Sequence, residues 1–257
     1  MNESVWIIDF GNTRQKLAEF VDGDFVQAWV NDDALERAQL AQQNQQLPGD
    51  IFVACTGTMS EEWEQMLGFL KQDESKNCRV FQVSNAHELP FQVEYESRAT
   101  LGLDRLANAA GAAAVDDESD WLIIDMGTCI TADLVSNKAF IGGSISPGID
   151  LRLRSMYAGT AQLPYIENWR DIALEGVAIH LGHNTTSALI AGAIGGVQSE
   201  LIQRIHAFSK EYPGMKVALT GGDAKYLQLH EDFTIFADPN LTLKGYFELY
   251  KRLIKQN

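Results

Sequence analysis

Several features that mark other protein classes are scarce or missing in this sequence. Only three cysteines occur, at positions 55, 78 and 129, widely spaced and without a Cys-X-X-Cys pair. They predict reduced thiols of a cytoplasmic protein rather than a disulfide framework or a zinc site. No run of 18 or more apolar residues is present, so we expect no membrane span. A strand begins within five residues of Met1, which is expected to leave no room for a signal peptide.

Positive charge is also in short supply. The sequence has 20 Lys and Arg against 35 Asp and Glu, a net charge of −15. Nucleic-acid binding needs basic patches that neutralise phosphates, so this balance argues against a nucleic-acid partner. What the sequence does have is the composition of a globular protein, with 46% apolar residues in 257. That length is comfortable for two domains of ordinary size.

One pattern occurs twice along the chain. Residues 5–13 and 121–128 are each an apolar run of strand length that ends in Asp, one apolar residue and Gly, at Asp9 and at Asp125. A second strand candidate and a turn follow each copy. This internal repeat predicts two related halves, and the acidic link at residues 116–120 is the natural boundary between them. We therefore expect domains at residues 1–117 and 118–257.

A turn of this kind has a specific chemistry. Glycine lets the backbone come close to a ligand, so successive N–H groups can point at phosphate oxygens. An Asp at the strand end can hold a cation, and Thr or Asn adds hydrogen-bond donors. For one copy alone, a plain β-hairpin would be the better interpretation. Two copies that open two halves favour a phosphate site.

Helix and strand signals alternate through the first half. We expect strands at residues 51–55 and 79–83, a polar helix at 34–46, and an amphipathic helix that Ser60 caps and that carries Trp63 to Leu70 on its apolar face. The order strand, helix, strand implies parallel crossovers and an α/β fold.

The Gly102-Leu103-Asp104-Arg105 turn leads into an alanine-rich helix at residues 107–115. Asp104 and Arg105 are therefore expected in the first turn of a helix, where the dipole stabilises a carboxylate and free N–H groups can receive a substrate anion. An ordinary Asp near a helix N-cap, with an Arg on the solvent face, is about equally supported by the local sequence.

The second half contains a glycine-rich stretch and a long apolar helix. We expect residues 140–148 to form a strand that ends in a Gly/Pro-rich loop, and Asn184 or Thr185 to cap a helix at 188–208. The double glycine Gly221-Gly222 predicts a turn over which a nucleoside could lie, with a simple βα loop as the alternative. The chain is expected to close with an amphipathic helix around Tyr246 to Leu253.

The long helix also carries an assembly prediction. Its apolar stripe looks broader than one small domain covers, which favours burial between two chains, although packing inside its own domain is the alternative. The stripe consists of Leu189, Ile194, Val197, Leu201 and Ile205.

Four motifs, in order, resemble signatures of the type III pantothenate kinases. Asp9-Phe10-Gly11-Asn12-Thr13-Arg14-Gln15-Lys16 resembles the D-x-G-N-T-x-x-K phosphate motif of that family, and the Gly102–Arg105 turn resembles its G-x-D-R substrate motif. Asp125-Met126-Gly127-Thr128 and residues 142–148 match the remaining signatures. The resemblance covers nearly the whole chain and implies the duplicated actin-like, RNase H-like two-domain fold of acetate and sugar kinases. Leu103 and Cys129-Ile130 depart from the smaller residues that are frequent there, which affects substrate packing rather than chemistry.

The resemblance also implies an activity and residue roles. The activity is ATP-dependent phosphorylation of pantothenate, the first step of coenzyme A synthesis, by a homodimer that uses Mg²⁺ and a potassium or ammonium ion. Asp104 resembles the general base, and Asp125 resembles the ligand of the monovalent cation. Residues 9–16 and Thr128 correspond to ATP contacts. The positions that correspond to pantothenate contacts are Tyr95, Gly102, Leu103, Asp104, Arg105 and Thr185, the last one supplied by the partner chain.

Two rival functions remain open on the sequence. Some relatives of this family act as accessory factors in gene regulation, so the fold alone does not prove catalysis. The intact set of Asp9, Lys16, Asp104 and Asp125 favours the enzyme. A second rival is another enzyme of the actin-like class, such as a polyphosphate phosphatase or an acetate-type kinase, and the G-x-D-R turn argues against it.

Overall fold

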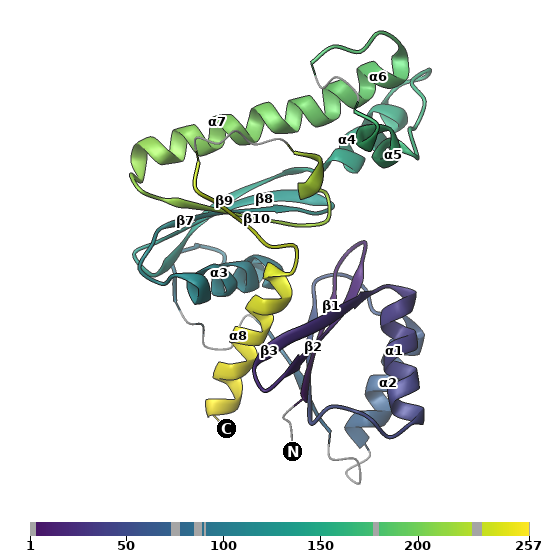
Figure 1. Ribbon diagram of the computed structural model, residues 1–257, viewed down its shortest axis with the longest axis vertical. Helices are drawn as coiled ribbons and strands as arrows, with labels where there is room; N and C mark the ends of the chain where they lie inside the picture. The colour runs from purple at the N-terminus through teal and green to yellow at the C-terminus, as the bar shows by residue number, and fades with distance from the viewer. Residues whose placement is uncertain are drawn as a thin grey trace. The chain divides into compact units, whose positions relative to one another are not determined.

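The computed structural model describes residues 4–72, 78–84, 89, 91–176, 180–227 and 233–256. The chain forms two compact units. The first contains residues 1–115 together with 241–257, and the second contains residues 116–240. Figure 1 shows the elements of both units.

The first unit is built on a mixed five-stranded sheet. Its strands are β1 (Ser4–Phe10), β2 (Gln15–Val21), β3 (Asp24–Val30), β4 (Asp50–Cys55) and β5 (Arg79–Gln82). They lie in the order β3-β2-β1-β4-β5. β1 pairs antiparallel with β2 and parallel with β4, as the alternation of strands and helices in the sequence predicts. A further short strand, β6 (Gln92–Val93), and a 3₁₀ turn, η1 (Arg98–Thr100), lead to the helix α3.

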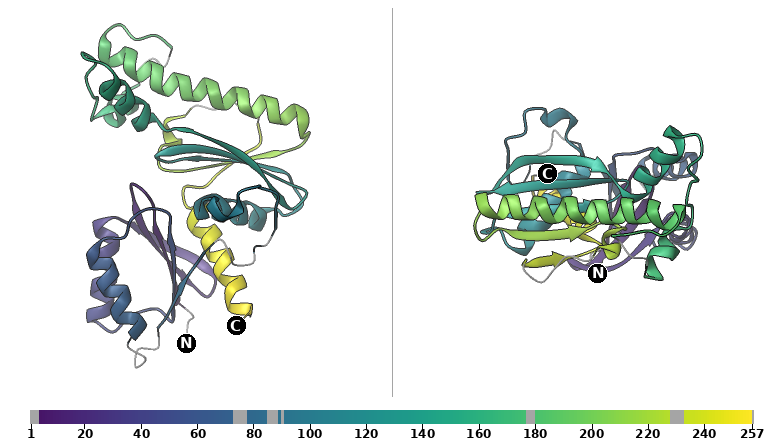
Figure 2. Two further views of the ribbon diagram at one scale, coloured as in Figure 1. Left: turned by 180° about the vertical axis from the view of Figure 1, so that it is seen from behind. Right: turned by 90° about the horizontal axis from the view of Figure 1, so that it is seen from above.

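Helices cover both faces of this sheet. They are α1 (Asp32–Gln43) and α2 (Glu61–Gln72) on one face and α8 (Leu241–Gln256) on the other, and α3 (Leu103–Val115) packs against α8. The side chains of Trp6, Ile8 and Phe10 alternate along β1 toward α1 and α2, where they form one apolar core with Trp63. α8 lies on the opposite face, with Tyr246 against Phe52, and α1, α2 and α8 can be followed from both sides in Figures 1 and 2.

The second unit repeats this topology. Its strands β7 (Trp121–Met126), β8 (Cys129–Ser136), β9 (Ala139–Pro147), β10 (Lys216–Thr220) and β11 (Ile235–Ala237) lie in the order β11-β10-β7-β8-β9. β7 pairs antiparallel with β8 and parallel with β10, as β1 does with β2 and β4. The internal repeat seen in the sequence is therefore present in the fold.

A long helix covers one face of the second sheet (Figure 1). It begins as α6 (Thr185–Ile190), continues through a π-helical turn, η2 (Ala191–Gly195), and ends as α7 (Gly196–Glu211). The remaining helices of this unit are α4 (Ile149–Gly159), α5 (Trp169–Leu174) and the 3₁₀ turn η3 (Ala224–Tyr226). None of the helices that the structure describes is long and apolar enough to cross a membrane.

The apolar stripe of the long helix corrects the sequence-based assembly argument. All five of its residues are buried within the core of their own unit, against Leu122, Ile124 and Ile130 of the sheet. The stripe therefore leaves no apolar face of this helix that needs a second chain. The sequence pattern shows a broad apolar face but does not reveal that the sheet of the same unit covers it.

Two other elements differ from their predicted form. Residues 142–147 continue β9 rather than forming a loop, because their backbone pairs with β8 as far as Pro147. α8 was expected in the second domain, but it groups with the first unit. There Thr242 donates to Asn108 of α3 at 2.8 Å, the Tyr250 hydroxyl donates to Asp50 of β4, and Gly245 packs on Ala107.

Candidate functional site

The turn between β1 and β2 presents the first set of predicted site residues. Gly11 N–H donates to the Arg14 carbonyl at 3.0 Å, which closes the turn over residues 11–14. Asp9 and Lys16 lie directly opposite each other on the two strands, so their side chains share one face of the sheet. This face is the one that α8 covers, since neighbouring residues of β1 point to the α1–α2 core.

Asp9 is buried, with 5% of its surface exposed. It lies beside Cys55 at the end of β4, whose thiol pKa is raised by burial and by the negative charge of Asp9. A buried carboxylate of this kind requires positive charge or hydrogen-bond donors nearby. The position fits a group that faces a metal–phosphate complex.

Gly57 lies in the turn after β4 and is a residue for which no role was predicted. A Cβ at this position would overlap the Gly11 carbonyl and the Asn12 N–H. Gly57 N–H also donates to the Phe10 carbonyl at 2.8 Å. The turn after β4 therefore supports the turn after β1 from behind, and the Thr56-Gly57-Thr58 sequence directly after a buried strand was the available signal.

Asp104 lies in the first turn of α3, as predicted. Its Oδ1 accepts the backbone N–H of Arg105 at 2.9 Å, which fixes the orientation of the carboxylate. A Cβ on Gly102 would overlap the same oxygen. The glycine of the G-x-D-R turn is therefore needed to leave the carboxylate where it is.

Arg105 is buried and not on the solvent face, so the ordinary interpretation of this turn is wrong on that point. Only 4% of its surface is exposed, and its guanidinium lies 5.4 Å from the ring centre of Tyr95. A buried arginine stacked on an aromatic ring is held rigidly and keeps its full positive charge. The structure thus brings Tyr95, ten residues before Arg105 in the sequence, into contact with the Gly102–Arg105 turn.

Asp125 is the next-to-last residue of β7, the position that Asp9 has on β1. Its direct neighbours are Thr131 on β8 and Thr220 on β10, so all three side chains share one face of the sheet. Within the described part of the chain, the buried hydroxyl oxygens of both threonines have no hydrogen-bond partner. An Asp between two unsatisfied oxygens matches the ligand preference of a hard cation. No described group of three or more His, Cys, Asp or Glu side chains could hold a metal ion.

Glycines also hold the turn after β7. A Cβ on Gly148 would overlap the carbonyls of Gly127 and Thr128, and one on Gly221 would overlap the backbone of Met126. Thr128, the predicted ATP contact, is exposed on this turn. The glycine-rich motifs of the second half therefore fix the backbone around Thr128.

The double-glycine turn after β10 is anchored from α5. Asp223 N–H donates to the Met126 carbonyl at 3.1 Å, and Asp223 Oδ1 accepts from Arg170 Nη2 at 3.2 Å. The Arg170 guanidinium lies 4.3 Å from the ring centre of Trp169. Only a 3₁₀ turn, not a helix, follows the glycines.

Thr185 is the first residue of α6, and Asn184 is its N-cap, as predicted. The Asn184 side chain accepts the Ser187 N–H at 2.9 Å, and the Ser187 hydroxyl accepts the Asn184 N–H at 3.1 Å in return. Thr185 is exposed at this capped end. Its hydroxyl is thus free of the capping box and accessible from outside the chain.

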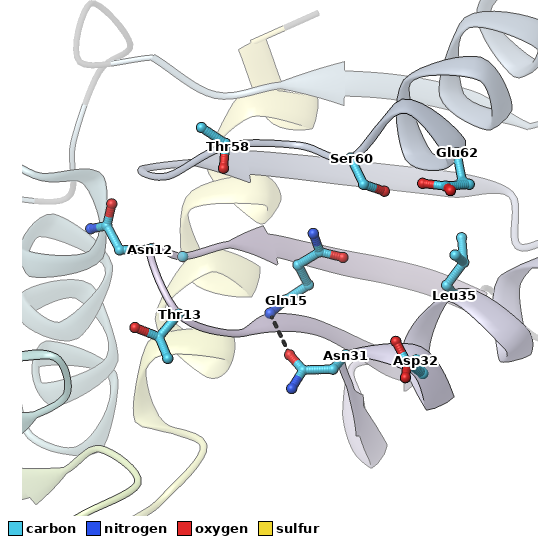
Figure 3. A pocket seen from close by; sticks show the side chains of 10 residues that line it. Asn12, Thr13, Gln15, Asn31, Asp32, Leu35, Thr58, Ser60 and Glu62 are labelled. Atoms are coloured by element: carbon cyan, nitrogen blue, oxygen red, sulfur yellow. Dashed lines mark hydrogen bonds between the residues drawn. The ribbon is translucent and has the colours of Figure 1, made fainter. Parts of the chain in front are cut away.

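A cavity of about 480 Å³ lies on the other side of the first turn, toward α1 and α2 (Figure 3). Gln15 and Asn31 face its centre, and Ser60 and Leu35 line it from the two helices. Because Gln15 neighbours Lys16 on the strand, its side chain points to the face opposite Asp9 and Lys16. Asp9 and Lys16 therefore lie beside the turn of residues 11–14 on one face of the sheet, and the cavity lies beside it on the other face.

Solved structures of similar fold cover nearly the whole chain. A Campylobacter jejuni protein, whose name places it in the Baf family of transcriptional activators, has a TM-score of 0.57 at 20% identity and is covered over 99% of its length by 97% of this chain. Component A of the (R)-2-hydroxyglutaryl-CoA dehydratase of Acidaminococcus fermentans has a TM-score of 0.50 at 13% identity, with 96% of each chain covered. Together with the repeated sheet topology, they confirm the duplicated actin-like fold.

Sequence comparison is more specific than fold. The family model described as type III pantothenate kinase matches residues 5–207. A type III pantothenate kinase of Flavobacterium johnsoniae is 30% identical over 95% of this chain and 96% of its own length. Those of Flavobacterium psychrophilum and Phocaeicola vulgatus are each 32% identical, over 95% and 93% of this chain and 97% and 94% of their own lengths. The chain is a kinase that belongs to the type III pantothenate kinase family.

Proposed function

We propose that this protein transfers the γ-phosphoryl group of ATP to the hydroxyl of pantothenate, forming 4'-phosphopantothenate, the first step of coenzyme A biosynthesis. Family membership supplies the reaction class. The observation that carries the proposal is the Gly102–Arg105 turn, which holds a fixed carboxylate at a helix N-terminus beside a buried arginine. This combination suits a substrate that bears both an anionic group and a hydroxyl to be deprotonated.

Asp104 acts as the general base in this proposal. The hydroxyl oxygen of pantothenate attacks the γ-phosphorus, its proton passes to Asp104, and the bond to the bridging oxygen breaks to release ADP. A carboxylate of ordinary basicity is adequate, because the transition state of phosphoryl transfer is loose and the proton leaves late. Tyr95, Gly102, Leu103 and Arg105 bind and orient pantothenate around that carboxylate.

The β1–β2 turn binds the ATP phosphates. Backbone N–H groups of residues 12–14 face the phosphate oxygens, and Lys16 supplies positive charge from the neighbouring strand. Thr128 is a further proposed ATP contact. Asp9 lies where it would face Mg²⁺, which neutralises phosphate charge when bound. Local positive charge of this kind is required, since a protein of net charge −15 must bind two anionic substrates.

Asp125 is proposed as the ligand of a potassium or ammonium ion. The two threonine hydroxyls beside it support this role, because an oxygen buried without a partner gains most from a cation. We also propose a cytoplasmic homodimer in which Thr185 completes the pantothenate site of the partner chain. The exposed, capped start of α6 is compatible with such a contact.

A regulatory accessory factor is the competing function, and the name of the Campylobacter jejuni structure is the observation in its favour. At 20% identity that similarity concerns the fold alone. An assay of ADP release in potassium buffer, with and without pantothenate, separates the two. ADP release that requires pantothenate, with the phosphate ester detected by mass spectrometry, is expected. Absence of pantothenate-dependent turnover would leave the regulatory function as the better explanation.

A further inference from the structure

The strand β2 begins with an irregular hydrogen-bond pair between Gln15 and Asn31. In an antiparallel ladder, a hydrogen-bonded pair exchanges two backbone bonds. Here Asn31 N–H donates to the Gln15 carbonyl at 2.7 Å, but Gln15 N–H donates to the side-chain Oδ1 of Asn31 at 3.1 Å. The side chain thus replaces a backbone carbonyl.

The reason for the replacement is the helix that follows. The Asn31 carbonyl accepts the N–H groups of Ala34 and Leu35, at 3.0 and 3.2 Å, and so opens α1 instead of continuing the ladder. An Asn before a helix usually turns its side chain to cap the helix, yet the Asn31 carboxamide makes no such bond. It is directed to Gln15 instead.

Asn31 also has a backbone conformation that suits glycine. Its φ is 55° and its ψ is −123°, a combination that ordinary residues avoid. Strained residues of this kind persist where the surrounding structure fixes them, and they cluster at functional sites. Asn31 therefore has a strained backbone, and its side chain bonds to Gln15 instead of capping α1.

Gln15, which donates this bond, lies directly after the turn of residues 11–14. The turn of residues 11–14 is closed at its base by the bond from Gly11 to Arg14, and Gln15 is the next residue along the chain. Gly11, Asn12, Thr13, Gln15 and Asn31 line one cavity (Figure 3). Asn31 thus fixes the exit of the turn from the face opposite Asp9 and Lys16.

We propose that Asn31 is a positioning residue for the phosphate-binding turn: it holds Gln15, and through Gln15 the N–H groups of residues 12–14, in the geometry that receives the ATP phosphates. The inference rests on the proposed function of that turn. It assigns a role to a residue that lies outside the D-x-G-N-T-x-x-K motif.

The variant Asn31→Gly tests this role because it separates stability from nucleotide affinity. Glycine adopts the observed φ and ψ without strain, which offsets the loss of the side-chain bond, so we expect a melting temperature equal to that of the wild type or higher. Loss of the acceptor for Gln15 N–H should raise KM for ATP roughly 3- to 10-fold, as for one lost hydrogen bond, with KM for pantothenate unchanged. A purely structural role would lower the melting temperature and leave KM for ATP unchanged.

Two further variants complete the test. Asn31→Asp keeps the acceptor oxygen and should restore KM for ATP to within about twofold of the wild type, since an exposed charge is screened by salt. Asn137→Gly is the matched control, because Asn137 also has a positive φ, 50°, in the hairpin between β8 and β9. It also replaces an Asn of positive φ by glycine, and it should leave KM for ATP unchanged. An Asn31→Asp variant that behaves like Asn31→Gly would overturn the acceptor role.

Direct titration of each variant with ATP by calorimetry, without pantothenate, keeps this inference distinct from the proposed function. If the wild type binds ATP but does not phosphorylate pantothenate, the proposed function fails while weaker ATP binding by Asn31→Gly still supports Asn31. Equal affinities of Asn31→Gly and wild type would overturn the inference alone. A wild type that does not bind ATP would overturn both.

Discussion

Asp9 and Asp125 hold the same position in two copies of one sheet topology. Each is the next-to-last residue of the central strand of its sheet, directly before the last apolar residue of the strand and the glycine of a tight turn. Each has one antiparallel and one parallel neighbour, Lys16 and Ala54 for Asp9, and Thr131 and Thr220 for Asp125.

The different neighbours indicate different chemistry at the two equivalent positions. The lysine opposite Asp9 carries a positive charge, which suits phosphate oxygens. Two hydroxyls beside Asp125 supply neutral oxygen ligands, which suit a cation whose charge the carboxylate balances. Under the proposed function, the two copies of this strand and turn therefore have different roles, phosphate binding in the first half and cation binding in the second.

The first prediction concerns the general base. Asp104→Asn removes the proton acceptor while preserving the size and position of the side chain, so kcat should fall at least about 100-fold. ATP affinity, measured by calorimetry, should not change. Asp33→Asn is the matched control, because Asp33 is the second residue of α1, as Asp104 is of α3, and it should retain full activity. Near-normal turnover of Asp104→Asn would remove this residue from the mechanism.

The second prediction concerns the glycine before it. Gly102→Ala places a methyl group where the Asp104 carboxylate now lies, so the carboxylate must rotate away. We expect kcat to fall roughly 10- to 100-fold, since a misplaced catalytic group loses much of its effect. Gly68→Ala is the control, because a Cβ there meets no atom within 4 Å, and it should stabilise α2 without affecting kcat. Equal kcat values for both variants would show that the carboxylate tolerates the methyl group.

The sequence predicted this fold well where local patterns and a repeat were sufficient. The two hairpins, the capped start of α6 at Asn184 and the helix that begins around Asp104 all follow from hydrophobic period and turn chemistry. The sequence also predicts the Gly102–Arg105 turn. It does not predict the burial of Arg105, because the segment between Arg105 and its partner Tyr95 has no regular apolar period.

Tertiary packing explains the remaining differences. Nothing local to α8 reveals that its Tyr250 will bond to Asp50 of the first unit, about 200 residues earlier in the chain. A pattern of apolar residues shows that a helix face is buried but does not reveal what buries it. This is why the stripe of α7 was assigned to a dimer interface although its own sheet covers it.

The third prediction concerns the cation. Activity should depend on potassium or ammonium, and Asp125→Ala should weaken ATP binding. Thr220→Val removes one proposed cation ligand at nearly constant side-chain volume. The potassium concentration for half-maximal activity should therefore rise several-fold, because the lost contact has about the free energy of one hydrogen bond. Thr160→Val, which alters a hydroxyl at the end of α4, is the control. Equal rates in sodium-only and potassium buffers would argue against the site.

The fourth prediction concerns stability and pH. Burial alone would raise the pKa of Asp150, but hydrogen bonds from Arg154, Tyr165 and Trp169 outweigh it, and the pKa is lowered. A carboxyl with a lowered pKa stabilises the fold above its unfolded pKa of about 3.9 and loses that contribution as the pH falls through its folded pKa. Asp150→Asn should therefore cost roughly 1–2 kcal/mol at pH 7. In urea unfolding, the difference from the wild type should shrink as the pH is lowered below 4; a constant difference would contradict the assignment.

The last prediction concerns assembly, and it no longer depends on the stripe of α7. If the pantothenate site pairs Asp104 of one chain with Thr185 of the other, each site needs one intact residue from each protomer. Asp104→Asn and Thr185→Lys should then be inactive as separate homodimers. A mixed dimer of the two variants contains one site with both changes and one site with neither, so unfolding and refolding them together should restore activity.

The expected recovery follows from random pairing of the chains. Half of the dimers are mixed and each has one intact site of two, so about a quarter of wild-type activity should return in a closed two-fold dimer. Chains that each carry a complete site would give no recovery, since every site in the mixture would then contain one of the two changes. Sedimentation at micromolar concentration provides the independent check, because a fully active monomer is incompatible with a shared site. Recovered activity together with a dimeric mass would assign Thr185 to the partner's site.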